Sequence, residues 1–493
     1  MKKAIVIGAG LGGLSCAIRL ATSGYQVTVF EQQNAVGGKL QRVEYEGYHF
    51  DRGPSTITMP EAFERVFRTA GRRMEDYLDM YKIDPSTRNF FADGHIVDMS
   101  SDIEWMKEQI AAYSPHDASQ LNAFLSESRE LFQQADRQFL NTLLLDMKSK
   151  LKPQLISALL RIRPLTSLQK LLYRYFRHPN TLAMYGRYAT YVGSSPYQSP
   201  AIFAMMAHLE GTLGVYGVKG GTSAIPAAFE RLARELGVEI YTGAKVRKLL
   251  IHDGEVRGVE SERGAMSADV TIANGDVLSI CRDMIPALHR PSMSDSKIAA
   301  YEPSLSGFVS LIGVRKHYEQ LLHHNVYFPE HYEQEFQDIF GALVAPSNPT
   351  IYICHSGYSE PSMAPEGGSN LFVLANAPYT SSSWNWDMER GRYGSSLIKR
   401  LETRGLAGIT SAEVKRFYTP EDLQKDTGAY RGAIYGISSN SARQTFSRPA
   451  NTLKGLNRFW FVGGTTNPGG GTPIVTLSGQ LVAEEILSRD GRI

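Results

Sequence analysis

Apolar and polar positions at the start of the chain predict a strand, a helix and a second strand. Residues 4–7 form a short apolar run of the kind found in buried parallel strands. Between residues 14 and 23, apolar side chains recur at helical spacing, and Gly24 ends the predicted helix. Residues 26–30 predict the next strand, with Glu31 at its carboxyl end. The pattern therefore predicts a βαβ unit.

Two later parts of the chain show the same kinds of pattern. In the middle, we predict a helix over residues 227–236 and strands over 238–241, 245–249, 255–260 and 268–274. The strands 245–249 and 255–260 flank Asp253-Gly254, a typical hairpin turn. Near the end, residues 459–462 predict an apolar strand, and residues 474–487 predict a helix with Thr472 as its N-cap and Pro473 in its first turn.

Length and composition indicate a folded enzyme with more than one lobe. The 493 residues exceed one compact core, and 42% are hydrophobic and 21% charged. A net charge of +2 is too balanced to predict a nucleic-acid partner. Three widely separated cysteines predict a reducing, cytoplasmic environment and neither a disulfide framework nor a metal site. No apolar run reaches the roughly 18 residues of a membrane-spanning helix.

The turn after the first predicted strand has the glycine spacing of a dinucleotide-binding site. Gly8, Gly10 and Gly13 match G-x-G-x-x-G within the segment Gly8-Ala9-Gly10-Leu11-Gly12-Gly13. These glycines permit a tight turn, close approach of the backbone to a pyrophosphate, and close helix–strand packing. Helix N–H groups attract the phosphates, and Glu31 lies where an acid binds an unphosphorylated ribose. The cofactor predicted is FAD or NAD rather than NADP.

A second glycine-rich segment, Gly37-Gly38-Lys39, follows the predicted ribose acid. It can bring backbone N–H groups and a cation to the same diphosphate. The alternative is a Gly-Gly turn without a ligand.

Together these segments resemble the amine-oxidase and phytoene-desaturase superfamily of flavoproteins, which implies FAD as the cofactor. The family usually has Arg after the second Gly-Gly, whereas Lys39 keeps the charge but lacks the bidentate fork. Gly53, Pro54 and Ser55 match the family's D-x-G-P-S stretch near the flavin. The resemblance also implies that the backbone of Val246 touches the adenine; an ordinary core valine is the alternative.

At the carboxyl end, the resemblance implies that the glycine-rich turn and the helix after it contact the flavin. The implied residues are Gly463, Gly464, Pro473, Ile474 and Val475. N–H groups at a helix start can stabilise negative charge on the flavin. The expected fold is α/β, α+β overall, with a discontinuous Rossmann-type FAD-binding domain over 1–80, 215–290 and 421–493. The expected substrate-binding and helical membrane-associating region, of mixed sheet and helices, covers 81–214 and 291–420.

The expected substrate region contains a basic, apolar stretch. Residues 148–177 carry eight cations and no acid among many apolar side chains. Such a stretch suits the surface of an anionic membrane; a basic helix packed on the domain is the alternative. The resemblance favours the membrane, because carotenoid-modifying members take an apolar polyene from a bilayer. The run Phe203-Ala204-Met205-Met206 could line a tunnel or belong to the core.

No catalytic residue is assigned from the sequence, because no nucleophile triad, metal cluster or carboxylate pair stands out. A flavin accepts hydride without a protein nucleophile. Four residues are candidates for polar cavity positions, with a structural role as the alternative: Arg187, Tyr188, Tyr191 and Glu210.

The reaction is inferred from the carboxyl-terminal segment. Gly469-Gly470-Gly471-Thr472-Pro473 resembles the 4,4'-diaponeurosporene oxygenase group more than desaturases, although Asn467 stands where a His is expected. The resemblance implies oxidation of the terminal methyl of a C30 apocarotenoid, of the diaponeurosporene or diapolycopene type, to an aldehyde. The hypothesis is hydride loss from the allylic methyl and trapping of the cation by oxygen from water or dioxygen. A carotenoid desaturase, an amine oxidase and a non-catalytic flavin-binding protein remain alternatives, and the oligomeric state stays open.

Overall fold

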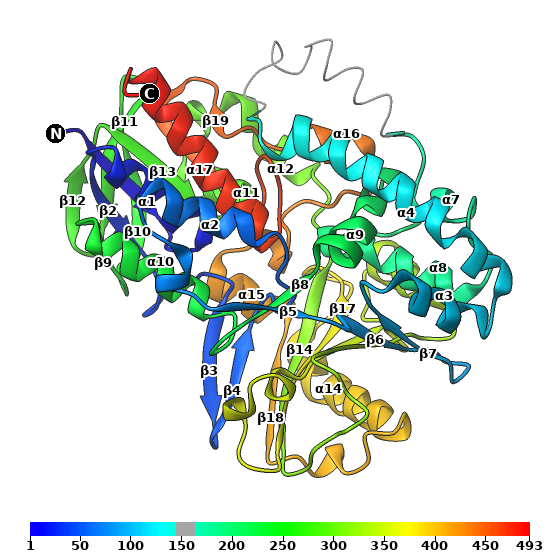
Figure 1. Ribbon diagram of the computed structural model, residues 1–493. Helices are drawn as coiled ribbons and strands as arrows, with labels where there is room; N and C mark the ends of the chain where they lie inside the picture. Colours follow the sequence, from blue (N-terminus) through cyan, green and yellow to red (C-terminus); the bar gives the residue numbers. More distant parts are fainter. Residues whose placement is uncertain (144–162) are drawn as a thin grey trace.

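The computed structural model describes residues 1–143 and 163–493. This part contains two large β-sheets with helices packed on them, and a mainly helical region between β7 (Ile96–Met99) and β8 (Val215–Val218) (Figure 1). Two separate two-stranded antiparallel sheets are also present: β3 (Gln41–Tyr45) with β4 (Tyr48–Arg52), and β5 (Met80–Ile83) with β8. The predicted α/β class, α+β overall, is confirmed.

The larger sheet brings the two ends of the chain together. Its strand order is β10-β11-β20-β13-β1-β2-β9, with β12 beside β11 and β19 beside β20. The strands are β1 (Lys3–Ile7), β2 (Gln26–Phe30), β9 (Glu239–Tyr241), β10 (Val246–His252), β11 (Glu255–Ser261), β12 (Gly264–Ser267), β13 (Val270–Asn274), β19 (Thr452–Leu453) and β20 (Leu456–Val462). β13 pairs in parallel with both β1 and β20. The first and last long strands are thus separated only by β13.

The helices of this sheet begin earlier than predicted. α1 (Leu11–Thr22) starts inside the glycine motif, and α10 (Ala224–Glu235) starts three residues before the expected position. α17 (Thr472–Arg489) has Gly471 as its N-cap, so the prediction of Thr472 as the cap was wrong. Gly471 adopts a φ of 108°, which side chains disfavour, and Thr472 therefore becomes the first helical residue.

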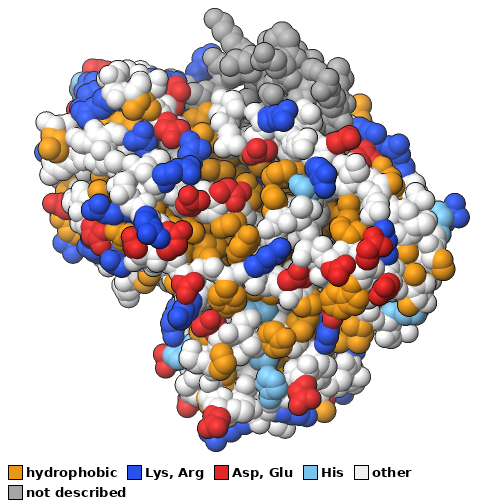
Figure 2. Space-filling view, viewed as in Figure 1, with side chains coloured by type: hydrophobic (Ala, Val, Ile, Leu, Met, Phe, Trp, Pro, Cys, Tyr) orange, Lys and Arg blue, Asp and Glu red, His pale blue; other side chains and the backbone are white. Residues whose placement is uncertain are grey.

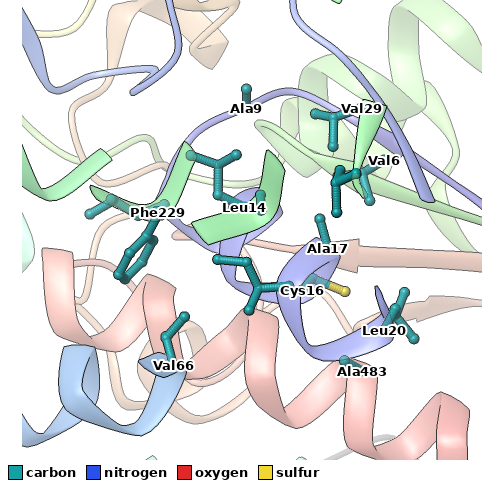
Figure 3. Close-up of a cluster of buried hydrophobic side chains, with 14 of the residues drawn as sticks. Val6, Ala9, Leu14, Cys16, Ala17, Leu20, Val29, Val66, Phe229 and Ala483 are labelled. Atoms are coloured by element: carbon teal, nitrogen blue, oxygen red, sulfur yellow. The ribbon is translucent and has the colours of Figure 1, made fainter. Parts of the chain in front are cut away.

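The core of this lobe lies on both faces of the sheet, as the alternation along β1 requires. Ala4 and Val6 belong to the cluster formed with α1, α2 (Pro60–Thr69), α10 and α17, whereas Ile5 points into the cluster on the other face. Figure 3 shows part of the first cluster, where Leu14, Phe229 and Ala483 come from three different helices. α1 and α17 approach closely, since a Cβ on Gly479 would lie 2.2 Å from the carbonyl oxygen of Gly12.

The smaller sheet has the order β18-β14-β17-β16-β15-β6-β7, and it is antiparallel except where β15 meets β6. Its other strands are β6 (Thr87–Phe90), β14 (Ser306–Val314), β15 (His324–Tyr327), β16 (Ile351–Cys354), β17 (Ser369–Ala377) and β18 (Val414–Tyr418). α14 (Trp386–Thr403) covers one face of it, with Trp386 stacked on Phe308 of β14. The sheet therefore has its own core.

One long helix, α4, and several short ones pack together in the helical region. They are α3 (Ile103–Ala111), α4 (Pro115–Ala135), α7 (Leu168–Leu172), α8 (Pro179–Gly186) and α9 (Met205–His208), with the π-helical turns η2 (Asp136–Leu140) and η5 (Leu209–Leu213) and the 3-10 turns η3 (Arg187–Val192) and η4 (Ala201–Ala204). The basic stretch 148–177 lies largely outside the described residues. In its described end, Leu168, Leu171, Leu172 and Phe176 are buried, as the packed-helix alternative predicts. Within 1–143 and 163–493, no helix is long and apolar enough to cross a membrane.

Candidate functional site

A cavity of about 1170 Å³ is lined by residues of the larger sheet, the smaller sheet and the helical region. On the face seen in Figure 2, hydrophobic side chains gather near the middle, between the lobes. The cavity is the candidate functional site, because it joins the glycine-rich segments to a mainly apolar wall.

Most residues predicted to bind the cofactor lie along this cavity. The lining includes Gly8, Gly10, Leu11, Gly12, Glu31, Gly37, Gly38, Lys39, Gly53, Pro54, Ser55, Val246, Gly463, Gly464, Pro473, Ile474 and Val475. Ala9 and Gly13 are the two predicted residues that do not line it. Five segments of the chain, which begin at residues 8, 37, 53, 246 and 463, therefore surround one cavity.

The glycines of the first turn are required by close backbone contacts. A Cβ on Gly8 would lie 2.3 Å from the carbonyl oxygen of Asn274, and one on Gly13 would lie 2.2 Å from the carbonyl oxygen of Gly8. The Nδ2 of Asn274 donates to the Gly8 carbonyl at 3.1 Å. Gly13 therefore acts through helix–strand packing, as its place in the motif predicts.

Glu31 is held at the end of β2 by two backbone donors. The N–H groups of Ala9 and Gln33 donate to its carboxylate at 2.7 and 2.8 Å. Burial raises the pKa of Glu31, and these donors oppose that change. The carboxylate thereby links the glycine turn to the end of the second strand.

Lys39 lines the cavity, but its ammonium group already has protein partners. Nζ donates to the carbonyl oxygens of Ile434 at 2.5 Å and Ala433 at 3.2 Å. Burial lowers the pKa of Lys39 to about 8, and nearby Asp276 opposes the change. This lysine therefore joins the second glycine segment to residues 433–434, a contact that the sequence did not predict.

The carboxyl-terminal turn is also held by side chains. The carbonyl oxygen of Asn467 accepts from Asn451 Nδ2 and Ser478 Oγ, both at 3.0 Å. Asn467 lines the cavity, and its buried Nδ2 has no hydrogen-bond partner among the described residues. At this position, where the resemblance suggests a His, the chain offers an amide donor to the site.

The helical region supplies an apolar wall. Ile202, Phe203, Met205, Met206 and Leu209 line the cavity. From the run at 203–206, only Ala204 lies behind the wall, where it is buried. The interpretation of this run as a tunnel lining is therefore favoured for three of its four residues.

The four polar candidates of the helical region form one cluster. The Nη2 of Arg187 lies 3.9 Å from Oε2 of Glu210, and both side chains are buried. Arg187 Nη1 donates to the hydroxyl of Tyr191 at 2.7 Å. Burial raises the pKa of Glu210, while Arg187, Tyr191 and Tyr188 oppose the change. Arg187 and Tyr191 line the cavity, whereas Glu210 and Tyr188 stand behind them.

A second group of hydrogen-bonded side chains lies on the side of the cavity formed by the smaller sheet. The hydroxyls of Ser55 and Tyr352 share a hydrogen bond of 2.7 Å, and Tyr352 in turn contacts Nδ1 of His324 at 2.7 Å. Ser55 and Tyr352 line the cavity, and His324 is fully buried behind them. Tyr191 and Tyr352 are therefore two of the hydroxyl-bearing residues that line the cavity, one from the helical region and one from the smaller sheet.

Another buried acid, Glu335, contacts two polar residues of the cavity lining. Glu335 accepts from the N–H and Oγ1 of Thr350 at 3.0 and 2.6 Å and from Asn376 Nδ2 at 2.8 Å. Thr350 and Asn376 line the cavity. Burial raises the pKa of Glu335 to about 7. The carboxylate thus orients two polar residues of the cavity lining.

This acid predicts a pH dependence of stability. Because the folded pKa of Glu335, about 7, exceeds its ordinary value of 4.5, its contribution is complete below pH 4.5 and is lost as the pH rises through 7. Between pH 5 and pH 8, we expect the wild-type Tm to fall about 2–3 °C more than that of Glu335→Gln. Thermal unfolding at both pH values measures this difference. Parallel Tm changes in the two proteins would contradict the expectation.

Sequence reasoning missed several residues of this site. Asn274, at the carboxyl end of β13, contacts the glycine turn and lines the cavity. Asp276, Thr350, Tyr352 and Asn376 also line the cavity. The signal for Asn274 and Asp276 was their position, since carboxyl ends of parallel strands surround the ligand in this fold class. Thr350, Tyr352 and Asn376 lie in or next to strands of the smaller sheet, and no motif marks them.

The chain matches a family model over nearly all its length. The model described as flavin containing amine oxidoreductase matches residues 11–487. The chain is 35% identical over 492 residues to the 4,4'-diaponeurosporene oxygenase of Staphylococcus haemolyticus (strain JCSC1435), covering 98% of this chain and 97% of that protein. It is 34% identical over 497 residues to the protein of that name from Staphylococcus aureus (strain USA300), covering 100% and 99%.

Solved structures show the same fold at low sequence identity. An oxidoreductase from Methanosarcina mazei has a TM-score of 0.65 at 16% identity, covering 98% of this chain and all of that one. Wild-type putrescine oxidase bound to putrescine has a TM-score of 0.66 at 12% identity, covering 99% of both chains. The full-length family match and the glycine-lined cavity lead to one conclusion: the chain belongs to the flavin-containing amine oxidoreductase family and is an FAD-dependent oxidoreductase.

Proposed function

We propose that this oxidoreductase oxidises the terminal methyl of a C30 apocarotenoid, of the diaponeurosporene or diapolycopene type, to an aldehyde. The observation that carries the proposal is one cavity with both a glycine-rich side and an apolar wall. Its volume of about 1170 Å³ exceeds the roughly 300–1,000 Å³ typical of a single small-molecule site. The space therefore suits FAD together with a second, apolar molecule. The names of the relatives, at 34–35% identity, support the same substrate class.

We infer that FAD lies on the glycine-lined side. Gly8, Gly12 and Gly53 line this side, and neighbouring protein atoms leave no room for a Cβ at any of them. Backbone without side chains lets a dinucleotide approach closely. The predicted residues that line the cavity would hold the cofactor, with Ala9 and Gly13 shaping the turn behind them. In this proposal, 1–80, 215–290 and 421–493 form the FAD-binding domain, and 81–214 and 291–420 form the substrate region.

The residues of the chain would mainly orient the polyene and exclude water. Bound FAD supplies a two-electron acceptor. Phe372 and Leu374 of β17 face the same cavity as Ile202 and Phe203, so an apolar chain can lie between sheet and helices. The Tyr191 and Tyr352 hydroxyls would hold the oxygen introduced at the terminal carbon. Forming the aldehyde removes four electrons from that carbon in two oxidations, so after each one the flavin would have to pass its two electrons to an external acceptor.

We further propose that the substrate comes from a membrane surface. In the described end of the basic stretch, Leu165 is 92% exposed and Tyr173 is 59% exposed, beside the exposed cations Lys170 and Arg174. Exposed apolar side chains next to cations suit an anionic bilayer. This arrangement would place the protein in the cytoplasm, peripherally attached to the membrane.

The product identifies the reaction. FAD-loaded protein is incubated with diaponeurosporene in anionic or neutral vesicles, and extracted pigments are resolved by mass. We expect a product that gains one oxygen and loses two hydrogens, formed faster from anionic vesicles. Protein stripped of FAD and then reloaded with it serves as the matched control, since activity must disappear and return.

Each other outcome favours a different function. Loss of two hydrogens without oxygen would indicate a desaturase. Unchanged pigment, with peroxide formed from an amine, would indicate an amine oxidase. If none of the candidate substrates reduces the flavin under anaerobic conditions, the result would indicate a non-catalytic flavin-binding protein. Equal rates of product formation from anionic and neutral vesicles would contradict the proposed membrane attachment but not the proposed reaction.

A further inference from the structure

A cluster of potential metal ligands lies behind the cavity wall, in the smaller sheet. His323, His324 and Cys354 are all buried, and one ligand-type atom from each lies within 4.8 Å of the others. The strand pairing produces this cluster. β15 begins at His324, β16 ends at Cys354, and the antiparallel register places these two residues opposite each other. Three nitrogen and sulfur donors therefore meet in one place.

Both imidazoles have one nitrogen held by a hydroxyl group. His323 Nδ1 lies 2.9 Å from Ser359 Oγ, and His324 Nδ1 lies 2.7 Å from Tyr352 Oη. The Nε2 of His324 is buried and has no hydrogen-bond partner among the described residues. Metal-binding histidines usually have their second nitrogen held in this way. A buried nitrogen without a partner is unfavourable, and a ligand at this position would satisfy it.

Another buried histidine follows the cluster in the sequence. His355 comes directly after Cys354, and neither of its ring nitrogens has a partner in the described chain.

We propose that His323, His324 and Cys354 bind one borderline-to-soft cation, with zinc(II) as the ion to test. Thiolate and imidazole donors prefer such ions to magnesium or calcium. Zinc–nitrogen distances of about 2.0–2.1 Å and zinc–sulfur distances of about 2.3 Å require donors roughly 3.3–3.8 Å apart. The donor atoms lie within 4.8 Å of one another, so they would have to close by at most about 1.5 Å.

Binding changes the protonation of the site but not its oxidation state. The S–H bond of Cys354 is replaced by a metal–sulfur bond, and the proton leaves to solvent. The ion would join β15 to β16 directly behind Tyr352, whose hydroxyl contacts His324 and whose side chain lines the cavity. The proposed role is therefore to fix the position of Tyr352, and it does not depend on the identity of the substrate.

The test measures metal content. Full-length, FAD-loaded protein is produced with added zinc, desalted without chelators and analysed by mass spectrometry for zinc per chain. We expect about one zinc in the wild type and in Cys281→Ser, but less than about a tenth of that in Cys354→Ser and His324→Ala. Cys281 is the matched control, because its thiol is equally buried but lies in a different cluster. Flavin absorbance shows whether each variant is folded.

Two results would overturn the site: a wild type that carries no more zinc than Cys354→Ser, or zinc retained in both Cys354→Ser and His324→Ala. If Cys354→Ser and His324→Ala both fail to take up FAD, X-ray absorption spectroscopy of the wild-type protein identifies the zinc ligands instead. A first shell with one sulfur and two imidazole nitrogens supports the proposal. A shell without sulfur rejects it.

Discussion

Gly13→Ala is expected to purify with less than about a tenth of the wild-type FAD content. The new Cβ would lie 2.2 Å from the Gly8 carbonyl oxygen and 3.0 Å from the Cβ of Asn274. The nearer contact is with backbone, so α1 has to move away from β1, and the glycine turn that lines the cavity moves with it. Flavin absorbance per chain, with and without added FAD, measures the effect.

Gly391→Ala in α14 is the matched control. A Cβ there meets nothing within 4 Å, and the residue is exposed. Alanine inside a helix should raise the free energy of unfolding by about 0.5–1 kcal/mol and leave the flavin content unchanged. A Gly13→Ala protein with full FAD content would show that the first turn does not need this close packing.

Arg187→Met is expected to lower the free energy of unfolding by about 3–5 kcal/mol at pH 8. The substitution leaves Glu210 fully buried beside the cavity without its cation. Because burial already raises the pKa of Glu210, loss of the cation should raise it further. The carboxyl can then take up a proton, so the loss of stability should be smaller at pH 5. Thermal or urea unfolding of the FAD-loaded protein at the two pH values measures this.

The double variant Arg187→Met/Glu210→Gln separates charge from packing. If the unpaired carboxylate causes the damage, neutralising it should restore at least about half of the lost stability. Arg234→Met is the control, since Arg234 pairs with Glu230 on a helix surface and is 50% exposed. Its effect should stay below about 1 kcal/mol. Equal losses for Arg187→Met and the double variant would mean that the packing of Arg187 matters more than its charge.

The parts of the fold visible in the sequence are those with local physical causes. The run at 4–7, the glycine turn and the strand at 26–30 are found within a few residues of their predicted positions, because strand and helix periodicity act over short distances. The starts of α1 and α17 were displaced. α17 begins after Gly471, whose φ of 108° favours glycine, whereas Gly10 before α1 has an ordinary φ of −75°. In both places several neighbouring residues could have served as caps.

The polar residues that the helical region and the smaller sheet contribute were less predictable, because they lie far apart in the chain. Arg187 and Glu210 were separate candidates until the helical turns brought them together. His324 and Tyr352 carry no motif, and only tertiary packing joins them to Ser55 of the D-x-G-P-S stretch. The sequence predicted no metal site, because strand pairing rather than ligand spacing places Cys354 opposite His324.

From the sequence alone came the α/β class, the FAD-binding motif and the family, since glycine spacing and short hydrophobic patterns reflect contacts between near neighbours. The tertiary structure decided which of the scattered polar residues face the cavity, that Lys39 binds carbonyl groups of residues 433 and 434, and that two histidines meet a cysteine behind Tyr352. These features depend on the packing of the two sheets and the helical region, which no local pattern encodes.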